Sequence, residues 1–327
     1  MSRRPSPGRA AAPPSGGDGP SALVVAAFGR HCLIETDDGR RLIAHPRGKK
    51  NQAVVGDRVL WQATGDEASI ERLQPRRNLF YRQDEIRTKS FAANLDRVLI
   101  LIAAEPEFSE AQLGRALVAA EAEQITPLIA LNKSDLTEPF ARAWARLAPY
   151  RAMGYTVLPL ALSSRGEATV GDAGLPALLQ ALQGHHTLVL GPSGSGKSTL
   201  INRLVPEAGV QTGELSQALQ SGKHTTTSTR WYWVQALDAT AQRGALIDSP
   251  GFQEFGLHHI EPSRLAHCMP DLRPYLGQCR FYNCTHLHEP GCAVLAQVAG
   301  QGREGTISER RHRLYAQLIE ELSQQRW

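Results

Sequence analysis

The segment from Gly191 to Thr199 combines residue types and spacing that suit phosphate binding. It reads GPSGSGKST and matches the pattern G-x-x-x-x-G-K-[ST], between a short apolar run and a segment of helical periodicity. Glycines let successive backbone N–H groups turn toward one anion, and the following helix adds the positive end of its dipole. The lysine of this pattern reaches the β- and γ-phosphates, and the serine ligates Mg²⁺. The sequence therefore predicts a nucleoside triphosphate site formed by Gly191, Ser193, Gly194, Ser195, Gly196, Lys197, Ser198 and Thr199.

A second motif, N-K-S-D, follows an expected strand at 127–131 and indicates which base is bound. Ligands of open α/β sheets bind just past the carboxyl ends of strands. The Asp135 carboxylate can accept both the N1–H and the N2 amino donors of guanine, whereas adenine lacks that pair and would leave it unpaired. We expect Asn132 to tie the loop together and the stem of Lys133 to lie over the purine. Ser163 is a weaker candidate for a second base contact.

Two further segments complete a nucleotide-hydrolysing set. A polar stretch at 222–227, GKHTTT, has the character of a switch loop whose threonine closes over Mg²⁺ and the γ-phosphate. The motif D-S-P-G follows an expected strand, so that Asp248 would hold the Mg²⁺ shell and Gly251 would offer its N–H to the γ-phosphate. We assign Ser198, Thr226 and Asp248 to magnesium, although the pattern does not separate Thr226 from its two threonine neighbours.

Three of the five cysteines fall within one short C-terminal stretch with the spacing C-x₄-C-x-H-x₅-C. An odd, clustered set of cysteines favours metal ligation over a disulfide framework. Three thiolates and one imidazole form a closed tetrahedral site of the structural zinc type. His288 lies two residues beyond the histidine of the pattern, and the spacing does not exclude it as the nitrogen ligand.

The chain has 327 residues, 42% of them hydrophobic, and a formal net charge of +4. This length suggests about two domains with real cores. Apolar runs are too short to span a bilayer, and no secretory leader is evident, so we expect a cytoplasmic protein without a membrane partner. We also expect a monomer.

Residues 1–20 are rich in Pro, Gly, Ser and Arg without apolar periodicity and read as a disordered tail. Residues 21–90 contain five short strand patterns, which favour a small OB-fold barrel. Basic residues crowd this part and aromatic residues interrupt them, which favours binding of single-stranded nucleic acid over a merely solvated surface. These residues are Arg40, Arg41, Arg47, Lys49, Lys50, Arg58, Arg72, Arg76, Arg77 and Arg82, with Phe80 and Tyr81.

Residues 91–258 alternate buried-strand and helix patterns, as in an α/β domain that binds nucleotide. Residues 259–327 hold the cysteine cluster and end in a helix with apolar residues at helical spacing. That helix is expected to pack on the zinc unit, and its Arg310, Arg311 and Arg313 are candidates for contact with RNA. The fold class predicted is therefore multidomain, with an all-β barrel, a central α/β domain and a mainly helical zinc-binding domain.

The base-reading motif precedes the phosphate loop, whereas in ordinary GTPases it follows D-x-x-G. With this order and these motifs, the chain resembles the circularly permuted bacterial family called ribosome small subunit-dependent GTPase A. The resemblance implies a GTPase with Mg²⁺ and one structural Zn²⁺, stimulated by the small ribosomal subunit late in its assembly and contacting its rRNA. It further implies Cys279, Cys284, His286 and Cys292 as the zinc ligands.

The residue after D-S-P-G is Phe252, where many GTPases carry a water-orienting glutamine. An apolar side chain cannot position water. The resemblance indicates His224 instead, and Gln253 is the rival. Lys197 of the phosphate loop and Thr226 of the switch loop are the other catalytic candidates. Two other functions stay open on the sequence alone. One is a P-loop ATPase or kinase, and the other is an RNA-binding module that holds nucleotide without turning it over.

Overall fold

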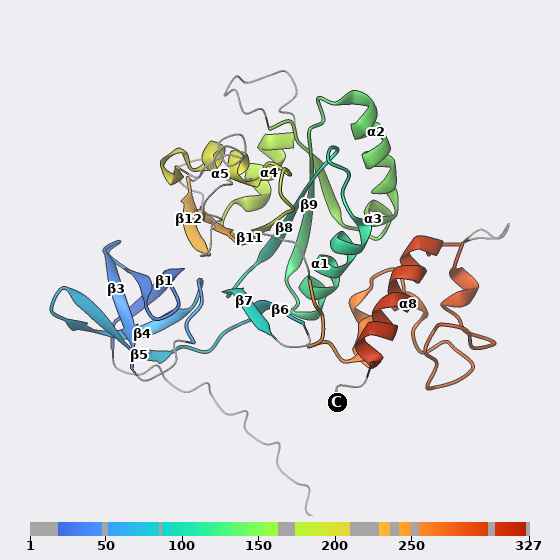
Figure 1. The fold of residues 1–327 in the computed structure, drawn as a ribbon, viewed down its shortest axis with the longest axis horizontal. Helices are drawn as coiled ribbons and strands as arrows, with labels where there is room; N and C mark the ends of the chain where they lie inside the picture. Colours follow the sequence, from blue (N-terminus) through green and yellow to red (C-terminus); the bar gives the residue numbers. More distant parts are fainter. Residues whose placement is uncertain are drawn as a thin grey trace, which may run out of the picture.

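The computed structural model places three units side by side, with the barrel and the C-terminal unit flanking a central sheet that is covered by helices (Figure 1). In the described part of the chain, every helix is too short or too polar to span a bilayer. The structure describes residues 19–47, 52–84, 87–162, 174–209, 229–235, 242–249, 255–299 and 305–324.

Five N-terminal strands close a barrel in the order β1-β2-β3-β5-β4, and β4 returns to pair with β1. Strand alternation builds its core, because Cys32 and Ile34 are fully buried while Leu33 and Glu35 between and after them are partly exposed. The parallel pairing of β3 with β5 completes the barrel, and the predicted OB-like unit is confirmed. The strands are β1 (Ser21–Ala27), β2 (Cys32–Thr36), β3 (Arg41–Pro46), β4 (Arg58–Thr64) and β5 (Glu67–Leu73).

A separate two-stranded sheet, β6 (Leu79–Gln83) with β7 (Thr88–Ala93), follows the barrel. Phe80 is fully buried, and its ring lies 5.9 Å from that of Phe91 and 5.5 Å from that of Phe255. The expectation that Phe80 belongs to a nucleic-acid surface is therefore wrong, because its ring is part of the hydrophobic core.

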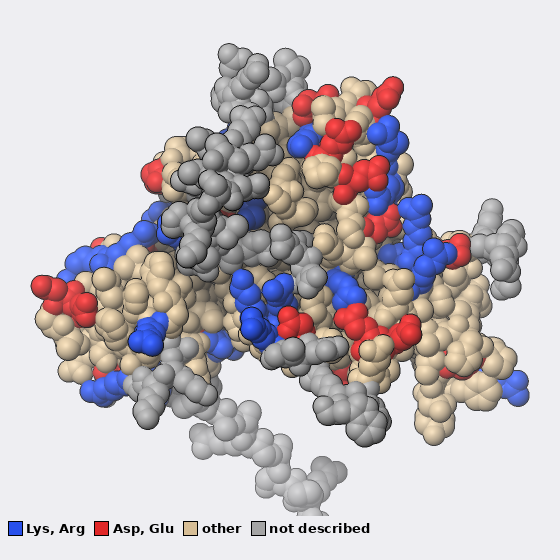
Figure 2. All heavy atoms as spheres, viewed as in Figure 1, with Lys and Arg blue, Asp and Glu red and all other residues tan. Residues whose placement is uncertain are grey.

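Many of the basic residues predicted to form an RNA surface are paired with carboxylates. In Figure 2, basic and acidic side chains lie near one another over the barrel. Arg76, for example, donates from Nε to Oδ1 of the buried Asp57 at 2.7 Å. Lys49 and Lys50 lie outside the described residues. Each such ion pair lowers the net positive charge that the barrel can offer to a polyanion. The other pairs are Arg40 with Asp38, Arg41 with Glu35, Arg47 with Glu71, Arg58 with Asp37 and Arg77 with Asp96.

The central sheet has the strand order β10-β9-β8-β11-β13-β12, parallel throughout except for β12 at the end. The carboxyl ends of the five parallel strands therefore lie along one edge, where the predicted motifs follow β9, β11 and β13. The strands are β8 (Arg97–Ala103), β9 (Thr126–Asn132), β10 (Thr156–Pro159), β11 (His186–Leu190), β12 (Arg230–Val234) and β13 (Gly244–Asp248).

Strand β8 shows why the sheet is covered on both faces. Val98, Ile100 and Ile102 belong to one hydrophobic cluster, and Leu99 and Leu101 belong to a second. Because strand side chains alternate between faces, the continuous apolar run serves two cores at once. Helices α1 (Glu110–Ala122), α2 (Thr137–Arg146) and α3 (Ala148–Ala152) supply the first cluster, and α4 (Gly174–Leu182) and α5 (Lys197–Leu204), which turns into η1 (Pro206–Ala208), supply the second.

Strand β12 joins the central sheet to the barrel. It pairs with β13 over its whole length and reaches β1 at the pair Ala26 and Arg230. Beside this junction the indole Nε1 of Trp233 donates to Oε1 of Glu35 at 2.6 Å. The strand that follows the predicted switch loop in the sequence is therefore in direct contact with the barrel.

The C-terminal unit packs on α1 through α8 (Glu309–Ser323), whose N-cap is Ser308. Arg311 is buried and makes two hydrogen bonds to Asp271, at 2.9 and 3.0 Å. The expectation that Arg311 contacts RNA is therefore wrong, because its guanidinium stabilises the interior. Arg310 pairs with Glu110 and Arg313 with Glu309. The remaining short elements are α7 (Pro262–Leu265), η2 (Ala266–Cys268), η3 (Arg273–Tyr275) and η4 (Leu295–Gln297).

Candidate functional site

The phosphate loop runs from the end of β11 to the start of α5 and depends on its glycines. Gly194 has φ of +80° and Gly196 has φ of +98°, a region that side chains with a Cβ rarely adopt. A Cβ on Gly191 would overlap the carbonyl oxygen of Leu101 in β8. The loop therefore needs glycine both for its backbone turns and for its close approach to the neighbouring strand.

Asn132 joins three loops at the carboxyl edge of the sheet. Its side chain is almost fully buried; Nδ2 donates to the carbonyl oxygen of Ser195 at 2.9 Å, and Oδ1 accepts from the N–H of Leu162 at 2.9 Å. A Cβ on Gly196 would overlap this amide nitrogen. The N-K-S-D loop is thus hydrogen-bonded to the phosphate loop although 63 residues separate the two partners.

The rest of the N-K-S-D loop is held by its backbone. Lys133 has φ of +66°, and its carbonyl oxygen accepts from the N–H of Leu136 at 3.1 Å. The N–H of Ser134 donates at 2.9 Å to the carbonyl oxygen of Leu160, the residue after β10. The Asp135 side chain is exposed at this edge. These bonds leave the Asp135 carboxylate accessible to a ligand.

Lys197 lies at the start of α5 and faces the end of β13. Its Nζ donates to Oδ1 of Asp248 at 3.2 Å and to the carbonyl oxygen of Ser249 at 3.0 Å. Asp248 is buried, and the hydroxyl of Ser249 donates to the carbonyl oxygen of Val189 in β11. Ser198 and Thr199 are partly exposed in the first turn of α5. The role of Ser249 escaped the sequence analysis because a carbonyl acceptor has no signature in residue type.

Several predicted site residues lie in the part of the chain that the structure does not describe. Ser163, His224, Thr226 and Gly251 lie outside the described residues, as does Gln253. Their roles stay predictions. The structure does bring Asn132 to Ser195 and Lys197 to Asp248, and these four residues come from the ends of three parallel strands and the loops after them.

The four predicted zinc ligands form a compact cluster, with their ligand atoms within 4.8 Å of one another. The Nδ1 atom of His286 lies 3.5 Å from the sulfurs of both Cys279 and Cys292, and these sulfurs are 3.8 Å apart. Ideal zinc bond lengths give tetrahedron edges of about 3.8 Å between two sulfurs and about 3.6 Å between sulfur and nitrogen. Cys284 is the fourth member. The donor set therefore fits a tetrahedral metal of the zinc type.

Hydrogen bonds around the cluster fix its ligands. The N–H groups of Ala293 and Leu295 donate to the sulfurs of Cys279 and Cys292, both at 3.4 Å, which favours the thiolate form. His286 has φ of +63°, and its carbonyl oxygen is 2.7 Å from Nε2 of His312 in α8. His288 is exposed and outside the cluster, so the geometry resolves the alternative that the spacing left open.

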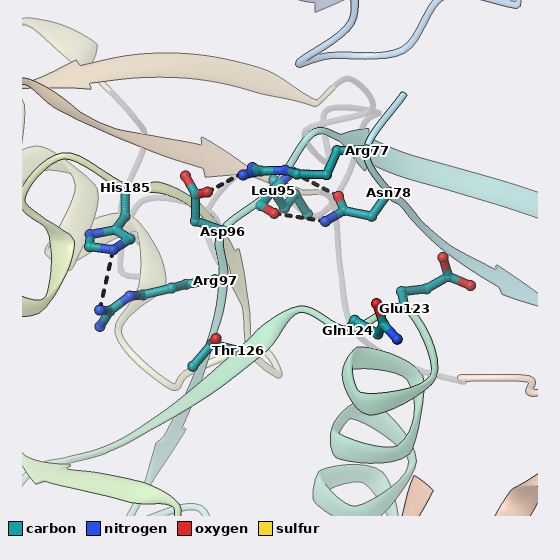
Figure 3. A pocket seen from close by; sticks show the side chains of 9 residues that line it. All are labelled: Arg77, Asn78, Leu95, Asp96, Arg97, Glu123, Gln124, Thr126 and His185. Atoms are coloured by element: carbon teal, nitrogen blue, oxygen red, sulfur yellow. Dashed lines mark hydrogen bonds and ion pairs between the residues drawn. The ribbon is translucent and has the colours of Figure 1, made fainter. Parts of the chain in front are cut away.

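A polar cavity of about 370 Å³ lies at the opposite edge of the sheet, where β8, β9 and β11 begin (Figure 3). Its charged side chains are largely paired with one another, Arg77 with Asp96 at 2.7 Å and Arg97 with His185 at 3.4 Å. Burial raises the pKa of Glu123 on its rim. Because ligands of parallel sheets bind at the carboxyl ends of the strands, this cavity is not the nucleotide site.

Comparisons with known proteins agree with this architecture. The RsgA GTPase family model matches residues 73–258. A curated relative from Variovorax paradoxus (strain S110), named small ribosomal subunit biogenesis GTPase RsgA, is 64% identical and covers 98% of this chain and 99% of its own. A relative of the same name from Paraburkholderia phytofirmans (strain DSM 17436 / LMG 22146 / PsJN) is 54% identical, with 92% and 93% covered.

Two solved structures share the fold. YloQ, described as a circularly permuted GTPase, aligns with a TM-score of 0.67 at 25% identity, covering 94% of this chain and 97% of its own. YjeQ from Thermotoga maritima aligns with a TM-score of 0.70 at 25% identity, covering 94% and 99%. The predicted circular permutation is confirmed by this likeness and by the strand order, in which β8, β9 and β10 precede the phosphate-loop strand.

Proposed function

The chain belongs to the RsgA GTPase family, and on this basis we propose that it hydrolyses GTP as a late assembly factor of the small (30S) ribosomal subunit. In this proposal it binds the rRNA of that subunit, and the subunit stimulates hydrolysis. It acts in the cytoplasm as a monomer and without a membrane partner. The relatives named small ribosomal subunit biogenesis GTPase support the partner, and their coverage of nearly the whole chain supports the transfer.

One observation carries the nucleotide assignment. The Asn132 amide bonds to the carbonyl oxygen of Ser195, so the motif proposed to read guanine and the loop proposed to hold phosphate form one site. Asp135 then accepts from the guanine edge while Lys197 contacts the β- and γ-phosphates. The other phosphate contacts come from backbone N–H groups and from the hydroxyls of the serines and the threonine, in Gly191, Ser193, Gly194, Ser195, Gly196, Ser198 and Thr199. In this proposal Lys133 lies over the purine, Ser163 lies beside it and Gly251 contacts the γ-phosphate.

The hydrolytic step needs charge stabilisation and an oriented water. Bound Mg²⁺ would neutralise charge that develops on the β- and γ-phosphate oxygens, with Ser198, Thr226 and Asp248 holding its shell. Lys197 adds a second positive charge, and its present contact with Asp248 keeps it at the phosphate loop. We assign orientation of the water to His224, because an imidazole accepts a hydrogen bond whereas Phe252 cannot.

The same proposal divides the chain into functional parts. They are a tail at 1–20, an RNA-binding barrel domain at 21–90, a GTPase domain at 91–258 and a zinc-binding domain at 259–327. Zinc held by Cys279, Cys284, His286 and Cys292 is structural, since four protein ligands leave no open position for chemistry.

Turnover measurements with and without small subunits test the proposal most directly. We expect GTP hydrolysis to rise when subunits are added, and Lys197→Ala to abolish it. Equal displacement of labelled GDP by ATP and GTP would refute guanine reading. Asp135→Asn should lose GTP and gain xanthosine triphosphate, because xanthine replaces the donor at position 2 by an acceptor that an amide can meet. If His224→Ala keeps the stimulated rate and Gln253→Ala loses it, the water-orienting role moves to Gln253.

A further inference from the structure

Two neighbouring aromatic side chains project from the loop between the first two cysteines of the cluster. Tyr282 is fully exposed, at 103% of its reference area, and Phe281 is 41% exposed. Aromatic side chains usually bury most of their surface, and an exposed Tyr ring has the apolar body and polar tip typical of recognition surfaces. Two adjacent exposed rings therefore indicate a surface that contacts another molecule.

The loop is built to hold these rings outward. The N–H of Cys284 donates to the carbonyl oxygen of Phe281 at 3.3 Å, which closes a four-residue turn with Tyr282 and Asn283 at its centre. The N–H of Arg280 donates to the carbonyl oxygen of Gly291 at 3.0 Å. Because the turn is already formed, a ligand that binds Tyr282 pays little ordering cost.

The charged residues nearest the tip in the sequence are basic. The Arg280 guanidinium lies 5.5 Å from the centroid of the Phe281 ring. Residues 272–288 contain no Asp or Glu, although they contain two Arg and two His. The next acid, Glu289, is directed into its own loop, where it accepts from the N–H groups of Thr285 at 2.7 Å and of Leu287 at 3.2 Å. In Figure 2 the loops beside α8 show little acidic surface on the face in view.

We propose that Arg280, Phe281 and Tyr282 form a docking site for an unpaired RNA nucleotide, with its base stacked on Tyr282 and its phosphate at Arg280. Proteins bind splayed bases of single-stranded RNA by stacking them on exposed aromatic rings beside a cation, and the Arg280 guanidinium beside the Phe281 ring supplies that cation. The inference rests on the proposed function, since it names which part of the zinc unit contacts RNA. It assigns this contact to the tip and not to the helix α8, whose Arg311 is buried.

Fluorescence anisotropy of a labelled single-stranded 12-mer of adenylate, added to the zinc-loaded full chain, tests the site. Tyr282→Ala and Tyr282→Leu should each weaken binding between about 5-fold and about 150-fold, the range for loss of one base stack. Tyr282→Trp should bind as the parent does, because it keeps an aromatic face. Asn283→Ala, in the same turn, is the matched control and should leave binding unchanged.

Arg280→Ala should lower the slope of log affinity against log salt by about 0.7, the value for one contact to a single-strand phosphate. Metal content and circular dichroism equal to the parent's show that each variant keeps its fold. Parent-like binding by Tyr282→Ala overturns the proposal. The proposal is also overturned if the parent binds neither the 12-mer nor naked small-subunit rRNA. It is overturned as well if Tyr282→Ala weakens binding to intact subunits but not to RNA alone, because the tip would then contact a ribosomal protein. Subunit-stimulated GTP turnover of the parent, measured separately, decides the proposed function independently.

Discussion

Replacing Gly196 by Ala should destabilise the protein more than the same change at Gly194. Both glycines lie in the phosphate loop with positive φ, +98° and +80°. Alanine in this region costs about 1–2 kcal/mol at either position. At Gly194 the nearest atom to an added Cβ is Pro106 Cδ at 3.6 Å, an ordinary contact, whereas at Gly196 it is the amide nitrogen of Asn132 at overlapping distance.

The additional cost at Gly196 follows from the hydrogen bond that the methyl group displaces. Asn132 is almost fully buried, and moving its amide away from Ser195 leaves buried polar groups without partners. Such a loss costs about 1–3 kcal/mol. We therefore expect about 1–2 kcal/mol for Gly194→Ala and about 2–5 kcal/mol for Gly196→Ala, read from urea unfolding of the nucleotide-free chain by circular dichroism.

A double-mutant cycle separates the clash from general strain. In the Gly196→Ala background the bond from Asn132 to Ser195 is already broken, so Asn132→Ala should cost about 1–2 kcal/mol less than it does in the parent. Equal unfolding free energies for the two glycine variants, together with strict additivity in the cycle, would refute the claim that this amide holds the two loops in contact.

Other predictions concern the C-terminal half of the chain. Arg311→Leu should cost about 3–5 kcal/mol in urea unfolding, because it leaves the Asp271 carboxylate buried and unpaired, whereas adding Asp271→Leu should recover most of that loss. Cys292→Ser should lower bound zinc measured by mass spectrometry, and chelation of the parent should lower its unfolding midpoint. Burial lowers the pKa of His259 from 6.5 to about 4, and among the described residues its ring nitrogens, beside the Tyr81 ring, have no hydrogen-bond partner. The unfolded chain therefore binds the proton more readily, so stability should fall as the pH drops from 6.5 toward 4, and His259→Phe should reduce that fall; an unchanged pH profile in the variant would contradict this origin.

The barrel and the sheet could be predicted because their patterns are local. The run from Val98 to Ile102 is apolar at every position, which is typical of a strand buried on both faces, and the structure shows such a strand. The five short strand patterns in residues 21–90 indicated the barrel in the same way. Strand periods depend on neighbours two residues apart, so no distant contact was needed to read them.

The charge pattern led to wrong expectations because it does not show which charges are paired by distant segments. A count of basic residues in 21–90 favoured an RNA surface, yet Arg76 lies against Asp57 and Arg77 against Asp96, each 19 residues away in the chain. Arg311 occupied a helix position that looked exposed by periodicity, and Asp271 from another segment buries it. Whether a charge is free depends on which segments fold beside it, and composition does not record that.

For this protein, the amino-acid sequence determined the chemistry of each motif. Residue type and separations of a few residues are enough to define three motifs: the glycine-rich loop with Lys197, the base-reading carboxylate of Asp135, and the spaced cysteines. The tertiary structure decided which motifs meet. It brought Asn132 to Ser195, excluded His288 from the cysteine cluster and joined the central sheet to the barrel through strand β12. The physical reason is that a hydrogen bond or a metal cluster is a short-range contact, and the packing of the whole chain sets which distant residues come within that range.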